Sequence, residues 1–244
     1  MSKFIIPGVF ANFGIKNAGG MSMQYILNQY ASVLRAVWTG DSVEGSTVID
    51  MMGAYNGTLH GATIVNDDKK RNCFSLTDGN YIQGAANIIT RSIVNTTHGG
   101  AGYTVFLWVK PNNIAVERYL MGFQMHERAG LKITNSGAVK FEASVYGYPE
   151  KTVSTPDGLI DTNWHLIELW HAVNGLVAGS SVSVKIRVDN EAWVNTTLDT
   201  GSTDDTGEFV IGKHTVGLVK ELFVVVGEAT DEMRNAIWNY GFGV

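Results

Sequence analysis

Short apolar runs separated by turn residues recur from residue 32 to the end of the chain, and this pattern most constrains the fold. Residues 103–109 read YTVFLWV, a nearly continuous apolar run that predicts a strand covered on both faces. Other runs are short, rich in β-branched residues and bounded by Gly, Asn or Asp, which is typical of all-β proteins. The chain holds 28 Gly and only 4 Pro, so turns are abundant and the runs between them are rarely interrupted. We therefore predict one large all-β domain.

Two segments predict hairpins. Leu131 and Ile133 precede Asn135-Ser136-Gly137, and alternation resumes at Val139. Residues 182–188 alternate between apolar and polar, and Asp189-Asn190 then turns the chain into residues 191–198. Such short loops join antiparallel strands. Residues 164–171, WHLIELWH, predict a further inner strand.

The first 31 residues differ from the rest and predict an N-terminal arm. Single Phe and Ile residues alternate there with Gly, Asn and Pro7, without a lasting periodicity. Ser22 is a candidate N-cap for a short helix through Tyr30, whose apolar face packs either on its own domain or on another molecule. We expect the arm to dock onto a scaffold or a second copy through its apolar residues: Phe4, Ile5, Ile6, Phe10, Phe13, Ile26, Leu27 and Tyr30.

The order of the strand-like segments resembles a known family. An opening strand that ends at Trp38 is followed by NGTLHGATIV, FSLTDGNYIQ, YTVFLWVKPN, NWHLIELWH, VKIRVDNEAWVNTTLD and FVIGKHTVGLVKELFVVVGEATDEM. This series, from residue 32 to about residue 240, is similar to the laminin-G-like and pentraxin-like domains of the concanavalin A-like lectin/glucanase fold. The resemblance implies a two-sheet antiparallel jelly-roll sandwich over residues 32–244, with residues 1–31 as a separate arm and a short helix near the C-terminus that opens at Thr230. It also implies that a concave sheet and its rim loops bind glycans or proteins.

Charge and cysteine content exclude several classes of partner. The formal net charge of −5 and the absence of a basic cluster argue against nucleic acid, because phosphate binding needs grouped Lys and Arg. The longest basic run, Lys69-Lys70-Arg71, follows two Asp residues and predicts a solvated loop. No apolar stretch approaches about 20 residues, so we expect no membrane insertion. Cys73 is the only cysteine and is predicted to be a small core residue without a disulfide partner in the chain.

The sequence favours neither a metal site nor catalysis. In many relatives the last strand begins with Gly-hydrophobic-Asp-Glu, whereas here Lys220 precedes Glu221, and Asp78 alone does not supply the six to eight oxygens that calcium takes. We expect no cofactor, with calcium as the one alternative left open. Paired carboxylates at the spacing of the related glucanases are absent, and no nucleophile elbow accompanies any of the 6 His residues. We therefore expect no catalytic residues, and we interpret His165 and His171 as structural.

Exposed aromatic side chains are the candidate ligand-binding residues, because sugar rings stack on them. Tyr146 and Tyr148 lie in a loop after a predicted strand, and Trp193 follows the turn at Asp189-Asn190. The alternative interpretation is that these rings close the core at a sheet edge.

Two functions follow from these features. The first is a non-catalytic structural or adhesive protein of a larger assembly, such as a bacteriophage capsid decoration, head fibre or tail adhesion component. It would be made in the host cytoplasm without a secretion signal, sit in many copies or as a homo-oligomer on the virion surface, and contact a cell-surface glycan or protein. The alternative is a stand-alone carbohydrate-binding lectin, cytoplasmic or exported; a glycoside hydrolase is the third.

Overall fold

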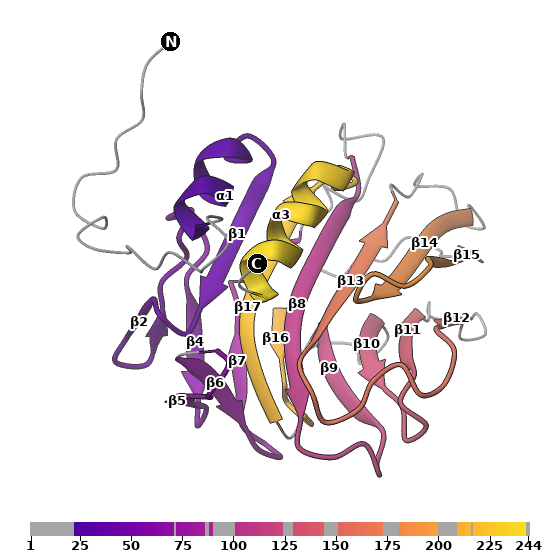
Figure 1. Ribbon diagram of the computed structural model, residues 1–244, viewed down its shortest axis with the longest axis horizontal. Helices are drawn as coiled ribbons and strands as arrows, with labels where there is room; N and C mark the ends of the chain where they lie inside the picture. Colours follow the sequence, from indigo (N-terminus) through magenta and orange to yellow (C-terminus); the bar gives the residue numbers. More distant parts are fainter. Residues whose placement is uncertain are drawn as a thin grey trace. The chain divides into compact units, whose positions relative to one another are not determined.

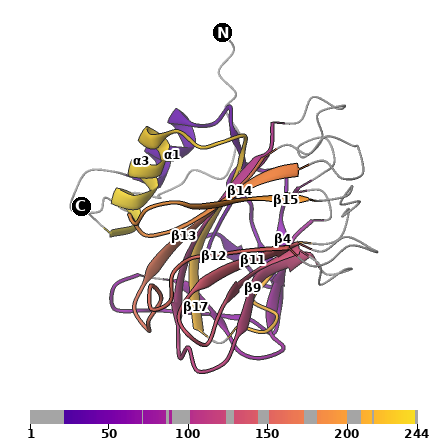
Figure 2. The same cartoon turned by 90° about the vertical axis from the view of Figure 1, so that its right-hand side faces the viewer.

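The fold is a β-sandwich of two antiparallel sheets, as predicted. The computed structural model describes residues 22–70, 72–85, 88–89, 101–123, 129–143, 151–172, 181–199, 209–215 and 217–242. Within these residues the first sheet, sheet A, has the order β15-β14-β13-β8-β17-β6-β5, with β1 also paired to β17. Sheet B has the order β12-β11-β10-β9-β16-β7-β4-β3-β2. Figures 1 and 2 show the strands of the two sheets from two sides.

The strands predicted at residues 103–109, 164–171 and 182–188 have closely similar bounds in the structure, whereas the strand predicted over residues 191–198 begins at Val194. Sheet A consists of β1 (Leu34–Thr39), β5 (Thr63–Val65), β6 (Cys73–Leu76), β8 (Tyr103–Pro111), β13 (His165–His171), β14 (Ser181–Val188), β15 (Val194–Asp199) and β17 (Gly217–Val226). Sheet B consists of β2 (Val43–Glu44), β3 (Thr47–Val48), β4 (Gly57–His60), β7 (Tyr81–Gln83), β9 (Arg118–Phe123), β10 (Ala129–Ile133), β11 (Val139–Ala143), β12 (Lys151–Ser154) and β16 (Phe209–Ile211).

Both predicted hairpins and the doubly covered strand are confirmed. Strand β10 pairs with β11 across residues 135–137, and β14 pairs with β15 across Asp189 and Asn190. In β8, all residues from Tyr103 to Val109 are buried. Alternate residues of each sheet face one common core; Trp38 from β1, for example, meets Phe209 from β16 edge to face at 6.2 Å.

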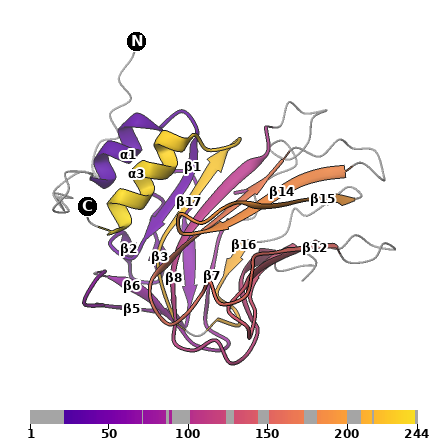
Figure 3. The same cartoon turned by 45° about the vertical axis from the view of Figure 1, so that its right-hand side comes forward.

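Strand β17 organises sheet A because it contacts three other strands. One side pairs with β8 along the strand, and the other pairs first with β6 and then with β1. Val219 faces Val109 and Leu222 faces Leu107, so Lys220 and Glu221 together stand opposite one residue of β8. This is a β-bulge, and it lies where the neighbour of β17 changes from β6 to β1. Figure 3 shows β17 beside β1.

Two helices form a second, smaller compact unit with the terminal segments. Helix α1 (Met23–Gln29) begins after Ser22, whose side chain accepts a hydrogen bond from the backbone N–H of Tyr25, so the predicted N-cap is confirmed. Helix α3 (Asp231–Phe242) contacts α1. Residues 1–32 and 230–244 group together, and residues 33–229 form the other unit. The prediction that residues 1–31 are a docking arm stays a prediction.

Candidate functional site

Tyr119 marks the strongest candidate site, on the face of sheet B that points away from the core. Core residues of β10 and β11 are Leu131, Ile133, Val139 and Phe141, so the residues between them point outward. Tyr119 in β9 lies opposite Lys132 in β10, and Lys132 lies opposite Lys140 in β11. Tyr119 is partly exposed. The outer face therefore carries an aromatic ring beside two cationic side chains.

The Tyr119 ring lies across a glycine and a lysine of the neighbouring strand. A Cβ atom added to Gly130 would come within 3.2 Å of two ring carbons of Tyr119, so glycine is what lets the ring lie against the sheet. The ammonium of Lys132 lies 4.1 Å from the ring centroid, within the range of a cation–π interaction. These contacts fix the orientation of the ring and support one of its faces.

Carboxylates surround the same lysine. Lys132 forms ion pairs with Glu142 and, at 3.2 Å, with Glu117, and Lys140 lies 2.5 Å from Glu142. Burial alone would lower the pKa of Lys132, but hydrogen bonds to Glu142, Tyr119 and Glu117 outweigh it and raise that pKa. Burial likewise opposes the charge of Glu142, yet its hydrogen bonds to Lys132 and Lys140 lower its pKa. We call Tyr119, Lys132, Lys140, Glu117 and Glu142 the Tyr119 cluster.

The loop after β16 adds a histidine to this surface. The hydroxyl of Thr215 donates a hydrogen bond to the carbonyl oxygen of Tyr119, and the N–H of Gly79 donates to the carbonyl oxygen of Lys213 at 3.1 Å. These bonds hold His214 so that its ring meets Tyr119 at 6.3 Å, nearly edge to face. Nδ1 of His214 lies 3.5 Å from a carboxylate oxygen of Asp78. Asp78 and His214 thus form the rim of the Tyr119 cluster.

Trp193, predicted from the sequence to bind ligand, lies beside β15 on sheet A. It is partly exposed, and the guanidinium of Arg187 lies 4.8 Å from its ring centroid. Arg187 also donates to Glu168 at 2.8 Å and so neutralises this buried carboxylate. Trp193 and Tyr119 thus each carry a cation over one ring face, and the ligand-binding role of Trp193 stays a prediction.

The other predicted site residues are either buried or lie outside the described residues. Tyr146 and Tyr148 lie outside them, as do Phe4, Ile5, Ile6, Phe10 and Phe13. Ile26 and Leu27 are buried, and Tyr30 is partly exposed. The roles proposed for these residues remain predictions.

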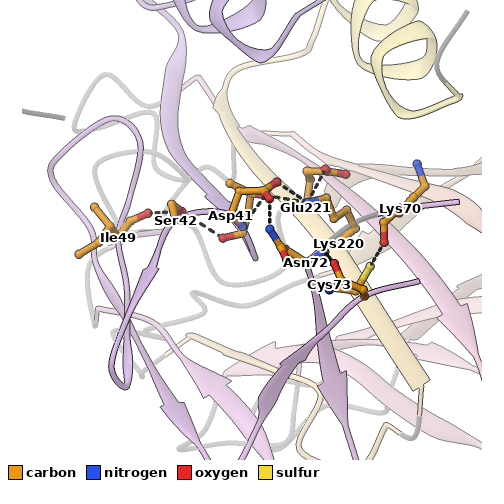
Figure 4. Close-up of polar contacts among 10 residues, drawn as sticks. Asp41, Ser42, Ile49, Lys70, Asn72, Cys73, Lys220 and Glu221 are labelled. Carbon is orange, nitrogen blue, oxygen red and sulfur yellow. Dashed lines mark hydrogen bonds and ion pairs between the residues drawn. The ribbon is translucent and has the colours of Figure 1, made fainter. Parts of the chain in front are cut away.

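A buried polar cluster at the β17 bulge is the second concentration of charge. The ammonium of Lys220 contacts Asp41 at 2.5 Å and Glu221 at 3.7 Å, and Asn72 donates to Asp41 at 2.6 Å (Figure 4). Burial raises the pKa of Glu221, an effect that Lys220 partly opposes. These contacts link the end of β1, the start of β6 and the bulge, so we interpret the cluster as a structural tie.

The prediction of a solvated basic run is wrong at Lys70. This side chain is buried, and its ammonium lies 3.9 Å from the ring centroid of Trp108 and 5.5 Å from that of Trp164. The aromatic faces take the place of water around the cation, and burial lowers its pKa. Lys69 is exposed, as expected. Cys73 is buried as predicted, and burial raises the pKa of its thiol to about 12.

His165 and His171 are both largely buried in strand β13. His165 lies between Asp189 at 2.8 Å and Asp161 at 3.0 Å; burial opposes its charge, but these two partners raise its pKa. Burial lowers the pKa of His171 to about 4. Among the described residues no group of three or more His, Cys, Asp or Glu side chains is arranged to hold a metal ion. The question of calcium stays open as a prediction.

Comparison with known proteins supports the fold. Neither a protein-family model nor a curated protein matches the sequence. The botulinum neurotoxin serotype C1 binding domain has a TM-score of 0.61 at 10% identity, over 85% of this chain and 52% of that one. A botulinum neurotoxin DC binding domain in complex with rat synaptotagmin II has a TM-score of 0.59 at 10% identity, over 85% and 51% of the chains.

A third solved structure is matched over nearly its whole length. Domain 4 of AbnA, an extracellular GH43 arabinanase of Geobacillus stearothermophilus, in complex with arabinotriose, has a TM-score of 0.54 at 15% identity, over 86% of this chain and 98% of that one. This chain spans about half the length of the toxin chains that it matches. At these identities the likeness shows the fold: an all-β sandwich of a kind found in binding domains. The laminin-G resemblance and the bacteriophage origin remain predictions.

Neither α1 nor α3 has the length and hydropathy needed to cross a bilayer, and the described residues contain no other helix of that kind.

Proposed function

We propose that the sandwich is a non-catalytic, glycan-binding module of a larger assembly, with residues 1–31 as the attachment segment. A bacteriophage virion component, such as a capsid decoration, head fibre or tail adhesion protein, is the assembly that we favour. The observation that carries the binding role is the Tyr119 ring, held on Gly130 and Lys132 on the outer face of sheet B. An oriented, partly exposed aromatic ring with polar groups around it suits a sugar, which has both apolar C–H faces and hydroxyl groups.

The charges of the Tyr119 cluster support binding rather than hydrolysis. A glycosidase acid must hold a proton near neutral pH, which requires a raised pKa. Lys132 and Lys140 instead lower the pKa of Glu142. The neighbouring Glu117 contacts the same lysine. Glu117, which exposes 45% of its side chain, is therefore the carboxylate suited to accept hydrogen bonds from sugar hydroxyls, whereas Glu142 is enclosed and paired with both lysines.

A stand-alone carbohydrate-binding protein is the second candidate. It is favoured by the similarity to the arabinanase domain, whose solved structure holds arabinotriose and which this chain matches over 98% of its length. Such a protein would need no attachment segment.

Two variants of the full chain separate these functions. Tyr119→Ala should weaken binding on a glycan array tenfold or more, since a stacked ring at the centre of a site contributes about 2 kcal/mol. Tyr81→Ala is the matched control, because Tyr81 belongs to the same sheet but stacks on His60 at 4.5 Å. Equal binding by the two variants would exclude the Tyr119 cluster as the site.

The second variant lacks residues 1–31. We expect it to keep its sugar affinity and to lose co-purification with the assembly. A truncated chain that still co-purifies contradicts the role of the segment, and a full-length chain that is never found on a particle favours the stand-alone protein.

A further inference from the structure

The charged groups around Tyr119 indicate which kind of sugar fits the site. Both lysines of the cluster are already ion-paired: Lys132 with Glu142 and, at 3.2 Å, with Glu117, and Lys140 with Glu142 at 2.5 Å. Lys132 is nearly enclosed, with 8% of its side chain exposed. Its ammonium is directed at the Tyr119 ring and at carboxylates of its own chain. An acidic ligand would have to break these pairs to reach either cation.

The carboxylates are the more accessible partners. Glu117 exposes 45% of its side chain, and Asp78 on the rim exposes 70%. Glu142 is enclosed between the two lysines, so the exposed carboxylate oxygens near the ring are those of Glu117 and Asp78. A ligand that approaches the Tyr119 ring therefore meets acceptors of hydrogen bonds before it meets donors.

We propose, resting on the function proposed above, that the Tyr119 cluster selects neutral sugars over acidic ones. The hydroxyls of a neutral sugar donate to the exposed oxygens of Glu117 and Asp78 while its C–H face lies on the ring of Tyr119. A uronic or sialic acid brings a carboxylate next to these oxygens, and like charges repel. The lysines position the ring and the carboxylates, and they form no ion pair with an acidic group of the ligand.

A matched panel of probes tests the proposal. The full-length protein is titrated calorimetrically with trisaccharides of glucose, galactose, xylose and arabinose, and with uronic acid oligosaccharides together with their carboxyl-reduced forms. We expect each carboxyl-reduced sugar to bind more tightly than its acidic parent. An acidic member that binds as well as its reduced form or better overturns the inference. If no sugar of either kind binds, the proposed function itself fails.

Salt and a charge variant provide a second readout. Raising the salt from about 0.01 M to about 1 M shortens the screening length from about 30 Å to about 3 Å. This change should strengthen binding of the acidic probes and leave the neutral ones nearly unchanged. Glu117→Gln keeps an acceptor but removes a charge, so the preference for neutral sugars should fall about fivefold at low salt.

Glu44→Gln is the control for the charge variant. Glu44 is exposed on β2, at the far edge of the same sheet, and its loss should leave the preference unchanged. A preference that moves equally in both variants would mean that the overall charge of the protein decides, and would overturn a role for the Tyr119 cluster in selection.

Discussion

At the scale of single residues, His171 makes stability depend on pH. Its ring is fully buried, stacks on Tyr103 at 5.2 Å and meets Phe141 edge to face at 6.0 Å. Nδ1 of His171 lies 2.9 Å from the carbonyl oxygen of Ala172, which accepts a hydrogen bond from it. Burial lowers the pKa of His171 from 6.5 to about 4, and its hydrogen bonds to the backbone only partly oppose this shift.

We predict that this residue costs stability in acid. As the pH falls from 6.5 to about 4, the unfolded chain takes up the proton before the folded chain does. The free energy of unfolding should therefore fall by about 3 kcal/mol across this window and change no further below it. Urea titrations at about pH 7 and about pH 4 should show a loss that is larger by this amount in the wild type than in His171→Phe. Other titrating groups are common to both proteins, so equal pH dependence in the two would refute the prediction.

Asp41 stabilises the fold, because its carboxylate neutralises the buried ammonium of Lys220. Lys220 is almost fully enclosed, and its ammonium lies 2.5 Å from a carboxylate oxygen of Asp41. We predict that Asp41→Asn destabilises the protein by about 3 kcal/mol, because an ammonium remains buried without that partner. The control is Asp78→Asn, which alters an exposed pair and should cost less than about 1 kcal/mol.

A double variant separates charge from packing at this position. Asp41→Leu combined with Lys220→Met removes both charges, and replacing a buried pair by apolar groups is often neutral. The double variant should therefore be more stable than Asp41→Asn in urea unfolding. If it is less stable, the cluster at the bulge stabilises sheet A through its hydrogen bonds rather than through charge balance.

At the scale of elements, the β10–β11 hairpin depends on a glycine for two separate reasons. Gly137 has φ +75° and a Cβ there would lie 2.5 Å from the carbonyl oxygen of Ile160. Gly158 nearby has a similar φ of +79° but nothing within 4 Å of its Cβ position. The two residues therefore separate backbone strain from a steric clash.

We predict that Gly158→Ala lowers the free energy of unfolding by about 1 kcal/mol, the cost of a left-handed alanine. Gly137→Ala should cost clearly more, because the hairpin must also move away from Ile160. Thermal unfolding of both variants measures the difference. Equal melting temperatures would mean that the turn relaxes without cost.

The elements also show what the sequence could predict. Strand β8 and the two hairpins follow from local alternation and turn residues, and α1 follows from the Ser22 cap. The sequence of β9 did not show which of its residues point away from the core. Its register shifts at Leu120, so Leu120 and Met121 both reach the core and the simple alternation fails. Only the order of the strands, which brings Lys132 beside Tyr119, shows that Tyr119 points away from the core.

The burial and pairing of charged residues could not be predicted from the sequence either. Lys70 belongs to a basic run that is usually solvated, and only the packing of Trp108 and Trp164 explains its burial. The sequence did not indicate the pairing of Lys220 with Asp41, which lies 179 residues away. Contacts between distant segments are set by the folded topology and leave no local signal.

At the scale of the whole molecule, sheet A depends on its last strand. Leu34 pairs with Val225, so the first strand of the sandwich acquires its partner only when β17 is in place. The same strand separates β8 from β6 and β1. A sheet built on such distant pairings folds slowly, on the order of milliseconds to seconds or longer, because long loops must close before the contacts form.

This dependence leads to a prediction about truncation. Residues 33–229 form one compact unit, so a chain with only these residues should fold cooperatively and retain the near-ultraviolet circular dichroism of its buried Trp residues. A chain that ends at residue 215 lacks β17, which leaves one side of β8 and the partner side of β1 unpaired, and it should give neither a native spectrum nor a cooperative urea transition. Cooperative unfolding of the shorter chain would mean that β8 and β13 with the strands of sheet B suffice for the fold, and that β17 only completes it.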